Sequence, residues 1–92
     1  MGAETSGVRQ VAEVLARIKD PELMLDFLKC ILTPYELEEI GGRWELVKLL
    51  HEGISQRKIS EQLGMSLCKI TRGSRELKKE DSAFKRVLSD YV

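Results

Sequence analysis

Apolar side chains recur every three or four positions along most of the chain, the spacing that places them on one face of an α-helix. In the N-terminal stretch the recurring residues are Val8, Val11, Val14, Leu15 and Ile18. This pattern predicts a first helix that ends near Lys19, with Thr5 or Ser6 as its N-cap. Asp20 and Pro21 then predict a restart, because aspartate can accept a backbone N–H and proline suits the first helical position.

A second helix is predicted from Pro21 to about Ile31, and its side chains are apolar nearly all round. The apolar residues of this segment are Leu23, Met24, Leu25, Phe27, Leu28, Ile31 and Leu32. A helix on the surface of a monomer normally keeps a polar face. The segment therefore suits burial between elements or between subunits.

The middle of the chain begins with a capping box, in which Thr33 can bond the backbone of Glu36 while the Glu36 side chain reaches back to Thr33. A short third helix is expected to stop at Gly41-Gly42, and a fourth helix is expected to end at Gly53. The apolar residues of the fourth helix are Trp44, Val47, Leu49 and Leu50. No segment alternates between apolar and polar residues for long enough to indicate a strand, so the predicted fold class is all-α with about six helices.

Residues 54–74 are expected to form two short helices joined at a glycine. Ser55 can cap a helix over residues 56–63, Gly64 supplies the turn, and Ser66 can cap a helix from residue 67 to about residue 72. The residues that would meet where these helices cross are Ile59, Leu63, Met65 and Ile70. The set matches a helix-turn-helix, whose second helix enters the major groove of DNA, although a generic helical hairpin would share the glycine and the spacing.

A last amphipathic helix is predicted at the C-terminal end of the chain. Its apolar residues fall at helical steps of three and four, and they are Phe84, Val87, Leu88 and Tyr91. Asp81 or Ser82 is available as its N-cap.

Polar and basic side chains dominate the outward face of the two joined helices. The candidate DNA-binding residues are Gln56, Arg57, Lys58, Leu67, Cys68, Lys69 and Thr71. Glutamine, threonine and arginine can bond base edges or phosphates, and lysine can approach a phosphate as a point charge. Leu67 and Cys68 could touch thymine methyl groups. Polar residues at helix starts are also ordinary caps, so this alternative stays open for each position.

The formal net charge is zero, but the charges are segregated along the chain. Residues 1–42 contain four bases and eight acids, a net charge of −4, and residues 43–92 contain eleven bases and seven acids, a net charge of +4. Within residues 56–79 seven bases face only two acids. Such a stretch could neutralise nucleic-acid phosphates, although a solvated helical face would look similar.

A chain of 92 residues allows one domain, which removes only a little over ~60% of its unfolded surface from water. With 42% apolar but 5% aromatic residues it can fill a helical core, yet it is poorly supplied for a sheet sandwich. Oligomerisation is a reasonable expectation for so small a core. The chain has no apolar run long enough to span a membrane and no pattern of a secretion signal at its start, so a cytoplasmic location is expected.

Metal and nucleophilic chemistry find little support among the residues. Cys30 and Cys68 lie 38 positions apart without the spacing of a metal site, and His51 is the single histidine. No metal site is expected, and the two cysteines are predicted to be buried free thiols. The acidic cluster at 36–39 is better explained by the preference for acids at a helix N-terminus than as an acid/base pair, so no enzymatic activity is expected.

Several short motifs occur together in the order and spacing of one family. They are Leu32-Thr33-Pro34, Gly42-Arg43, ISQRKISEQLG at 54–64, and Lys69-Ile70-Thr71-Arg72-Gly73-Ser74. The chain closely resembles the Trp repressor family from roughly residue 27 to residue 78. The most specific motifs are the first one and residues 70–74, because the others are shared with many helix-turn-helix proteins.

The resemblance implies an intertwined all-helical homodimer, built from a single Trp-repressor-like domain over residues 1–92. Dimerisation would use helices at about 5–52 and 81–91, and the helix-turn-helix at about 55–74 would meet successive major grooves of an operator duplex. The implied function is transcriptional repression of tryptophan metabolism genes, with L-tryptophan as the corepressor ligand.

The resemblance also implies a set of ligand-binding residues, which are Cys30, Leu32, Thr33, Arg43, Arg72, Gly73 and Glu76. Arg43 and Arg72 would flank the indole ring, and Arg72 with Thr33 would hold the carboxylate, in keeping with arginine chemistry. Backbone carbonyls around residues 30 and 32 would accept from the ammonium, and Gly73 would allow close approach. Without the family, the two arginines would be read as solvated surface residues.

Three positions depart from the family pattern. Lys69 stands where the family usually has a small hydroxyl residue, and Glu76 stands where it commonly has a serine near the ligand amine. Ser60 replaces a base that contacts phosphate in better-known members, a contact for which Lys58 and Lys69 could substitute. Glu76 could pair with an ammonium or close the pocket. The departures leave open an alternative: a related DNA-binding regulator that does not respond to tryptophan.

Overall fold

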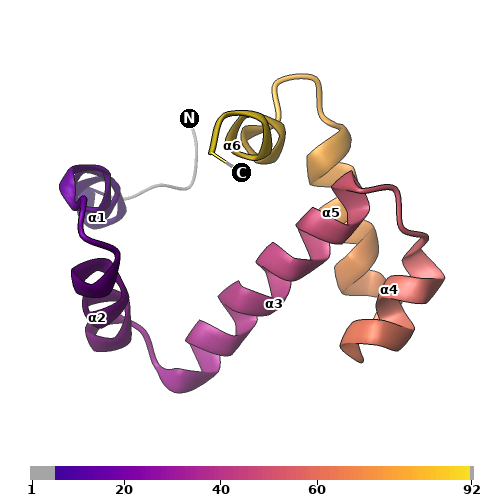
Figure 1. The fold of residues 1–92 in the computed structure, drawn as a ribbon, viewed down its shortest axis with the longest axis horizontal. Coiled ribbons are helices and arrows are strands. Elements are labelled where there is room, and N and C mark those ends of the chain that lie inside the picture. Colours follow the sequence, from indigo (N-terminus) through magenta and orange to yellow (C-terminus); the bar gives the residue numbers. More distant parts are fainter. Residues whose placement is uncertain (1–5, 92) are drawn as a thin grey trace. The chain divides into compact units, whose positions relative to one another are not determined.

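The computed structural model describes residues 6–91, which form six α-helices and no strand (Figure 1). The helices are α1 (Ser6–Arg17), α2 (Pro21–Ile31), α3 (Pro34–His51), α4 (Gln56–Leu63), α5 (Leu67–Lys78) and α6 (Ala83–Tyr91). The prediction of an all-α fold is confirmed. Within this part of the chain, no helix is long and apolar enough to cross a membrane.

The chain divides into two units, residues 1–37 and residues 38–92. In the first unit α1 ends at Arg17, slightly before the predicted end, and Ser6 is its first residue, whereas Thr5 lies outside the described residues. Asp20 caps α2 as predicted, because its carboxylate accepts from the backbone N–H of Glu22 at 3.0 Å. Neither α1 nor α2 has a buried residue. A single chain therefore does not bury the apolar face that the sequence supplies.

The capping box at the start of α3 is confirmed. The backbone N–H of Glu36 donates to Thr33 Oγ1 at 3.1 Å, and the backbone N–H of Thr33 donates to Glu36 Oε1 at 2.8 Å. These two bonds satisfy donors that the first helical turn leaves without a partner inside the helix.

The prediction that a helix ends at Gly41-Gly42 is wrong, because α3 runs without a break from Pro34 to His51. Both glycines lie within the helix, and neither has a positive φ. Glycine weakens a helix interior by only about 1 kcal/mol, which the flanking residues and their packing overcome. At Gly42 the missing side chain leaves room for Met65, whose Cε would lie 3.2 Å from an added Cβ. The helix ends instead just before Gly53, which has a φ of 89°.

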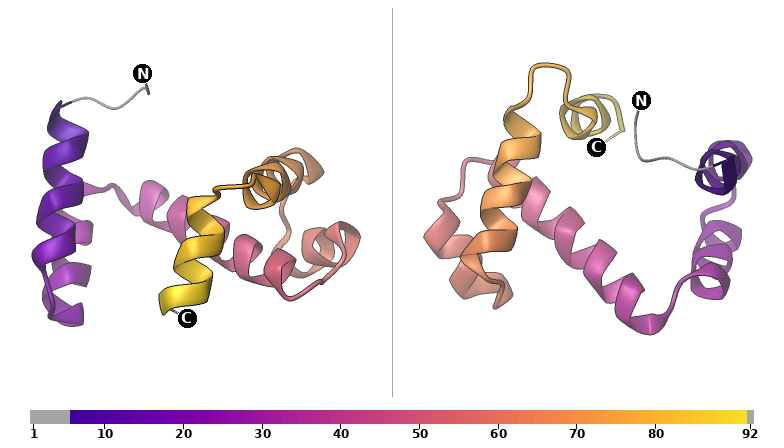
Figure 2. Two further views of the ribbon diagram at one scale, coloured as in Figure 1. Left: turned by 90° about the horizontal axis from the view of Figure 1, so that it is seen from above. Right: turned by 180° about the vertical axis from the view of Figure 1, so that it is seen from behind.

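The core of the second unit consists of two clusters that both use α3. The first joins Leu46 of α3 to Ile59 of α4 and Ile70 of α5. The second joins Val47 of α3 to Leu77 of α5 and Leu88 of α6. Helix α5 contacts both α4 and α6 (Figures 1 and 2). The inward positions predicted for α4 and α5 are confirmed, since Ile59 and Ile70 are fully buried and Leu63 packs beside them.

Helices α4 and α5 have the helix-turn-helix arrangement that the sequence predicts. Ser55 and Ser66 cap them by accepting from the backbone N–H groups of Lys58 and Lys69. Gly64 has the left-handed φ of 63°, a conformation that glycine adopts at little cost. Ser60 donates from Oγ to the carbonyl of Met65 at 2.8 Å and so ties α4 to the turn.

Helix α5 is longer than predicted, because it continues past Gly73 to Lys78. Gly73 faces α3, where Leu46 Cδ2 would lie 3.0 Å from an added Cβ. The glycine thus serves close helix packing rather than helix termination. Of the two predicted N-cap candidates of α6, Ser82 accepts from the backbone N–H of Lys85 at 3.4 Å, and Leu88 is the one buried residue of the apolar face of this helix.

The two roles of glycine predict opposite effects of alanine substitution. Gly41→Ala is expected to stabilise the fold by about 0.5–1 kcal/mol, since nothing lies within 4 Å of an added Cβ and α3 gains helix propensity. Gly64→Ala is expected to destabilise it by about 1–2 kcal/mol, because alanine must adopt the left-handed conformation. Urea unfolding followed by circular dichroism, at one protein concentration, measures both. A loss of stability in Gly41→Ala would contradict the continuous helix.

Candidate functional site

The first turn of α4 and the first two turns of α5 carry all seven residues that the sequence assigns to DNA binding. Most of them are exposed: Arg57, Lys58, Leu67, Cys68 and Lys69. Gln56 and Thr71 are half-buried and lie close to each other, with Thr71 Oγ1 donating to Gln56 Oε1 at 3.4 Å. The bond joins the start of α4 to the second turn of α5. It also orients the Gln56 amide, because the oxygen is used inside the protein and the NH2 group stays available as a donor.

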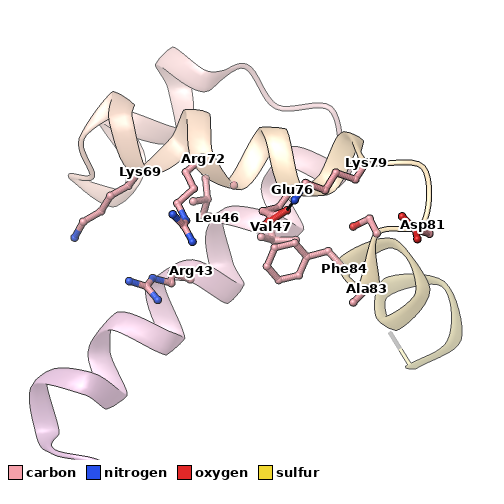
Figure 3. A pocket seen from close by; sticks show the side chains of 12 residues that line it. Arg43, Leu46, Val47, Lys69, Arg72, Glu76, Lys79, Asp81, Ala83 and Phe84 are labelled. Carbon is pink, nitrogen blue, oxygen red and sulfur yellow. Dashed lines mark ion pairs between the residues drawn. The ribbon is translucent and has the colours of Figure 1, made fainter. Parts of the chain in front are cut away.

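A cavity of about 410 Å³ lies on the side of α5 that faces α3 (Figure 3). Its lining residues are Arg43, Leu46, Val47, Lys69, Arg72, Gly73, Glu76, Lys79, Asp81, Ser82, Ala83 and Phe84. This volume is within the range of about 300–1,000 Å³ that is typical of small-molecule sites. The structure therefore brings four of the predicted ligand-binding residues into one cavity, namely Arg43, Arg72, Gly73 and Glu76.

The cavity has an apolar floor between charged side chains. Leu46 and Val47 supply the floor from α3, and Phe84 contributes a ring from α6 (Figure 3). Arg43 extends from α3 and Arg72 from α5, and both guanidinium groups face the same space (Figure 3). A flat apolar ligand that also carries an anionic group would match this combination, because guanidinium groups stack on rings and pair with carboxylates.

Glu76 meets Lys79 at one end of the cavity. Lys79 Nζ lies 2.6 Å from Glu76 Oε2, and the two residues are three positions apart on the chain. This hydrogen bond, together with the lysine charge, lowers the pKa of the Glu76 carboxyl below its usual value, and the charge of Arg72 acts in the same direction against a small desolvation effect. Glu76 is therefore a carboxylate at neutral pH.

Glu39 connects two cationic residues of the cavity lining. Its carboxylate lies 3.2 Å from Lys69 Nζ through Oε1 and 3.7 Å from Arg43 Nη2 through Oε2. Lys69 thus belongs to two sets at once, since the sequence assigns it to DNA binding and the structure places it in the cavity lining beside α3.

The other three predicted ligand-binding residues lie in the first unit and are not among the lining residues. Cys30 is in the last turn of α2, Leu32 follows that helix and donates its N–H to the Leu28 carbonyl at 2.9 Å, and Thr33 caps α3. The prediction of buried thiols is wrong, because Cys30 and Cys68 are both exposed free cysteines. Each cysteine lies on an exposed face of its helix, and this placement outweighs the general tendency of cysteine to be buried.

Several residues of the cavity were not predicted from the sequence. Leu46 is the most consequential, because it is 2% exposed and forms both the core contact to α5 and part of the cavity floor. Its place could be inferred from its spacing of three and four to Leu49 and Leu50 once α3 is known to be continuous. Lys79 could be found as the lysine three positions after Glu76.

The fold and the site define an all-helical protein with a helix-turn-helix. Its cavity has the size of a small-molecule site and lies between α3 and α5, the second helix of the helix-turn-helix. The family model described as Trp repressor protein matches residues 6–91. The chain belongs to the Trp repressor family, whose members are regulators of transcription.

Individual proteins give the same result. The chain is 40% identical to a Trp operon repressor homolog of Chlamydia caviae over 79 residues, which cover 85% of this chain and 78% of that protein. It is 31% identical to one of Chlamydia trachomatis serovar L2 over 90 residues, which cover 97% and 96%. It is 47% identical to one of Photobacterium profundum over 69 residues, which cover 71% and 64%. No solved structure matches the chain significantly.

The ion pair at Glu76 predicts a measurable titration. Because the lysine favours the charged form, the pair contributes to folding stability at neutral pH, and this contribution is lost as the pH falls through the lowered pKa. Carbon NMR titration should give a lowered Glu76 pKa in the wild type and a higher value in Lys79→Met. Lys78→Met is the matched control and should leave the lowered value in place. Equal Glu76 pKa values in the wild type and Lys79→Met would contradict the assignment.

Proposed function

We propose that the protein is a dimeric, sequence-specific DNA-binding repressor that acts in the cytoplasm on tryptophan metabolism genes, with L-tryptophan as corepressor. The observation that carries this proposal is the position of the cavity. Its walls come from α3 and α5, so a ligand in the cavity touches the second helix of the helix-turn-helix directly. Family membership supports the same class of function.

The DNA-binding surface in this proposal consists of the first turn of α4 and the first two turns of α5. Arg57 and Lys58 would neutralise phosphates, and Thr71 with Gln56 would present hydrogen-bonding groups to base edges. Leu67 and Cys68 are exposed on α5 and would offer apolar contact to thymine methyl groups. The concentration of basic residues in 56–79 supports this assignment.

The ligand site in this proposal uses the cavity behind α5. Its size and apolar floor suit an indole ring, which Arg43 and Arg72 would flank, and Arg72 would pair with the carboxylate. Glu76 is ionised and could attract the ligand ammonium. Gly73 keeps the wall at α5 free of a side chain. The family resemblance also assigns Thr33 to the carboxylate and the carbonyls around Cys30 and Leu32 to the ammonium, and these three assignments stay predictions.

Dimerisation is supported by the apolar surface that the single chain leaves uncovered in its first unit. Val8 is 57% exposed, Leu23 is 55% exposed and Ile31 is 48% exposed. Several exposed apolar residues on one short segment are typical of a surface that contacts another subunit. An intertwined dimer of α1 and α2 would cover them and would present two copies of α5 to one duplex.

The ligand would control DNA binding by changing how often the two copies of α5 are in positions that fit the duplex. A ligand that binds only the arrangement in which both copies of α5 fit the duplex raises the share of that arrangement. A coupling free energy of about 1–3 kcal/mol corresponds to a change of about 5- to 150-fold in DNA affinity. Because coupling is reciprocal, operator DNA would tighten ligand binding by the same factor.

A second candidate is a regulator of the same family that binds DNA without responding to tryptophan. The ion pairs at Glu76 and Lys69 favour it, because each occupies a polar group of the cavity that a ligand would otherwise engage. An amino-acid ligand would then have to compete with Lys79 for Glu76.

A duplex titration separates these possibilities. Duplexes selected from a random library by the protein with L-tryptophan serve as the probe, at fixed salt. L-tryptophan is expected to raise affinity for the selected duplex by about 5- to 150-fold, and Arg72→Ala is expected to lose this response while it keeps ligand-free binding. Arg57→Ala should bind more weakly with and without ligand. Equal curves with and without L-tryptophan would favour the second candidate, and equal binding of selected and arbitrary duplexes would contradict sequence-specific repression.

A further inference from the structure

Lys69 lies at the start of α5 and is held at both its backbone and its side chain. Its backbone N–H donates to the Ser66 cap at 3.4 Å. Its side chain turns back to α3, where Nζ lies 3.2 Å and 3.4 Å from the two carboxylate oxygens of Glu39. The ammonium thus faces the carboxylate as a whole rather than a single oxygen.

The surroundings of Glu39 favour its ion pair with Lys69. Its side chain is 24% exposed, whereas that of Lys69 is 48% exposed, so the carboxylate is the less solvated partner. Arg43 approaches the same carboxylate one helical turn later on α3. The two residues of the lysine pair are 30 positions apart on the chain, and the pair therefore links α5 to α3 rather than stabilising one helix.

An ion pair of this kind removes a positive charge from the DNA-binding surface. A lysine ammonium carries a single charge, and a carboxylate at hydrogen-bond distance offsets part of it and must be displaced before a phosphate can pair with the ammonium. DNA affinity depends on the number of phosphates that the protein neutralises, because each one releases condensed counterions. A lysine that stays paired with glutamate adds little to that number.

We propose that Glu39 is an intramolecular competitor of DNA phosphate, which holds Lys69 on α3 and lowers the affinity of the surface formed by α4 and α5. The proposal rests on the DNA-binding function proposed above. Glu39 is then a positioning residue that touches no DNA and sets how many phosphates each subunit neutralises. Release of Lys69 from Glu39 adds one phosphate contact per subunit.

The test is binding of Glu39→Gln to an arbitrary duplex over a range of salt concentrations. Arbitrary DNA is bound through phosphates, so the slope of log affinity against log salt counts phosphate contacts. The slope is expected to become steeper by about 0.9 per subunit, and low-salt affinity is expected to rise about two- to fivefold per subunit. Glu38→Gln is the matched control, because it makes the same charge change at the exposed neighbouring position, about 100° around the helix.

A double-mutant cycle shows whether the effect passes through Lys69. In a Lys69→Met background, Glu39→Gln should no longer steepen the slope beyond the effect of Glu38→Gln. Persistence of the gain in that background, or equal slopes for Glu39→Gln and Glu38→Gln, would overturn the proposal. Helix content and assembly mass of each variant are checked by circular dichroism and light scattering.

A comparison of single lysine variants gives an independent result if Glu39→Gln does not fold. Lys58→Met, on the exposed first turn of α4, should reduce the salt slope by about 0.9 per subunit, whereas Lys69→Met should reduce it much less. Equal reductions would overturn the competitor role. The proposed repressor function fails on a different observation, namely the lack of preference for selected over arbitrary duplexes.

Discussion

The packing of α5 on α3 is the contact on which the other features of the second unit depend. Ile70 is fully buried, Leu46 is 2% exposed, and Gly73 lets the two helices approach until an added Cβ would meet Leu46 at 3.0 Å. Burial of each of these aliphatic side chains stabilises the fold by about 1.5–3 kcal/mol. Ile70 faces inward, and Cys68, two positions earlier and about 200° around the helix, is exposed. The contact between α5 and α3 also forms the inner wall of the cavity.

Two charged residues of the cavity lining have ion-pair partners within this chain. Lys69 pairs with Glu39, and Glu76 pairs with Lys79. Each of these charges is thus balanced by an opposite charge of the same chain. The cavity has two arginines and an apolar floor, and a ligand that binds Lys69 or Glu76 must displace the ion-pair partner of that residue. Lys69 connects the cavity to the proposed DNA-binding surface, since it belongs to both.

Local features of the fold could be predicted from the sequence, and contacts between distant segments could not. The caps at Ser55 and Ser66 and the turn at Gly64 depend on neighbouring residues only, so their chemistry is visible in the sequence. The expected break at Gly41 failed because tertiary packing outweighs the modest helix cost of glycine. The pair between Glu39 and Lys69 joins residues 30 positions apart, and no sequence pattern marks it. For the candidate site, the family motifs identified four cavity residues, but the floor and the ion pairs required coordinates.

The central claim is that the cavity between α3 and α5 binds a ligand that acts on α5. Titration of L-tryptophan into the nitrogen-15-labelled protein, followed by two-dimensional amide NMR, tests it most directly. If the cavity binds this ligand, the amide signals of Arg72, Gly73 and Glu76 and those of the α3 turn around Arg43 shift saturably. An unchanged spectrum at saturating L-tryptophan, or shifts confined to residues far from this cavity, would contradict it.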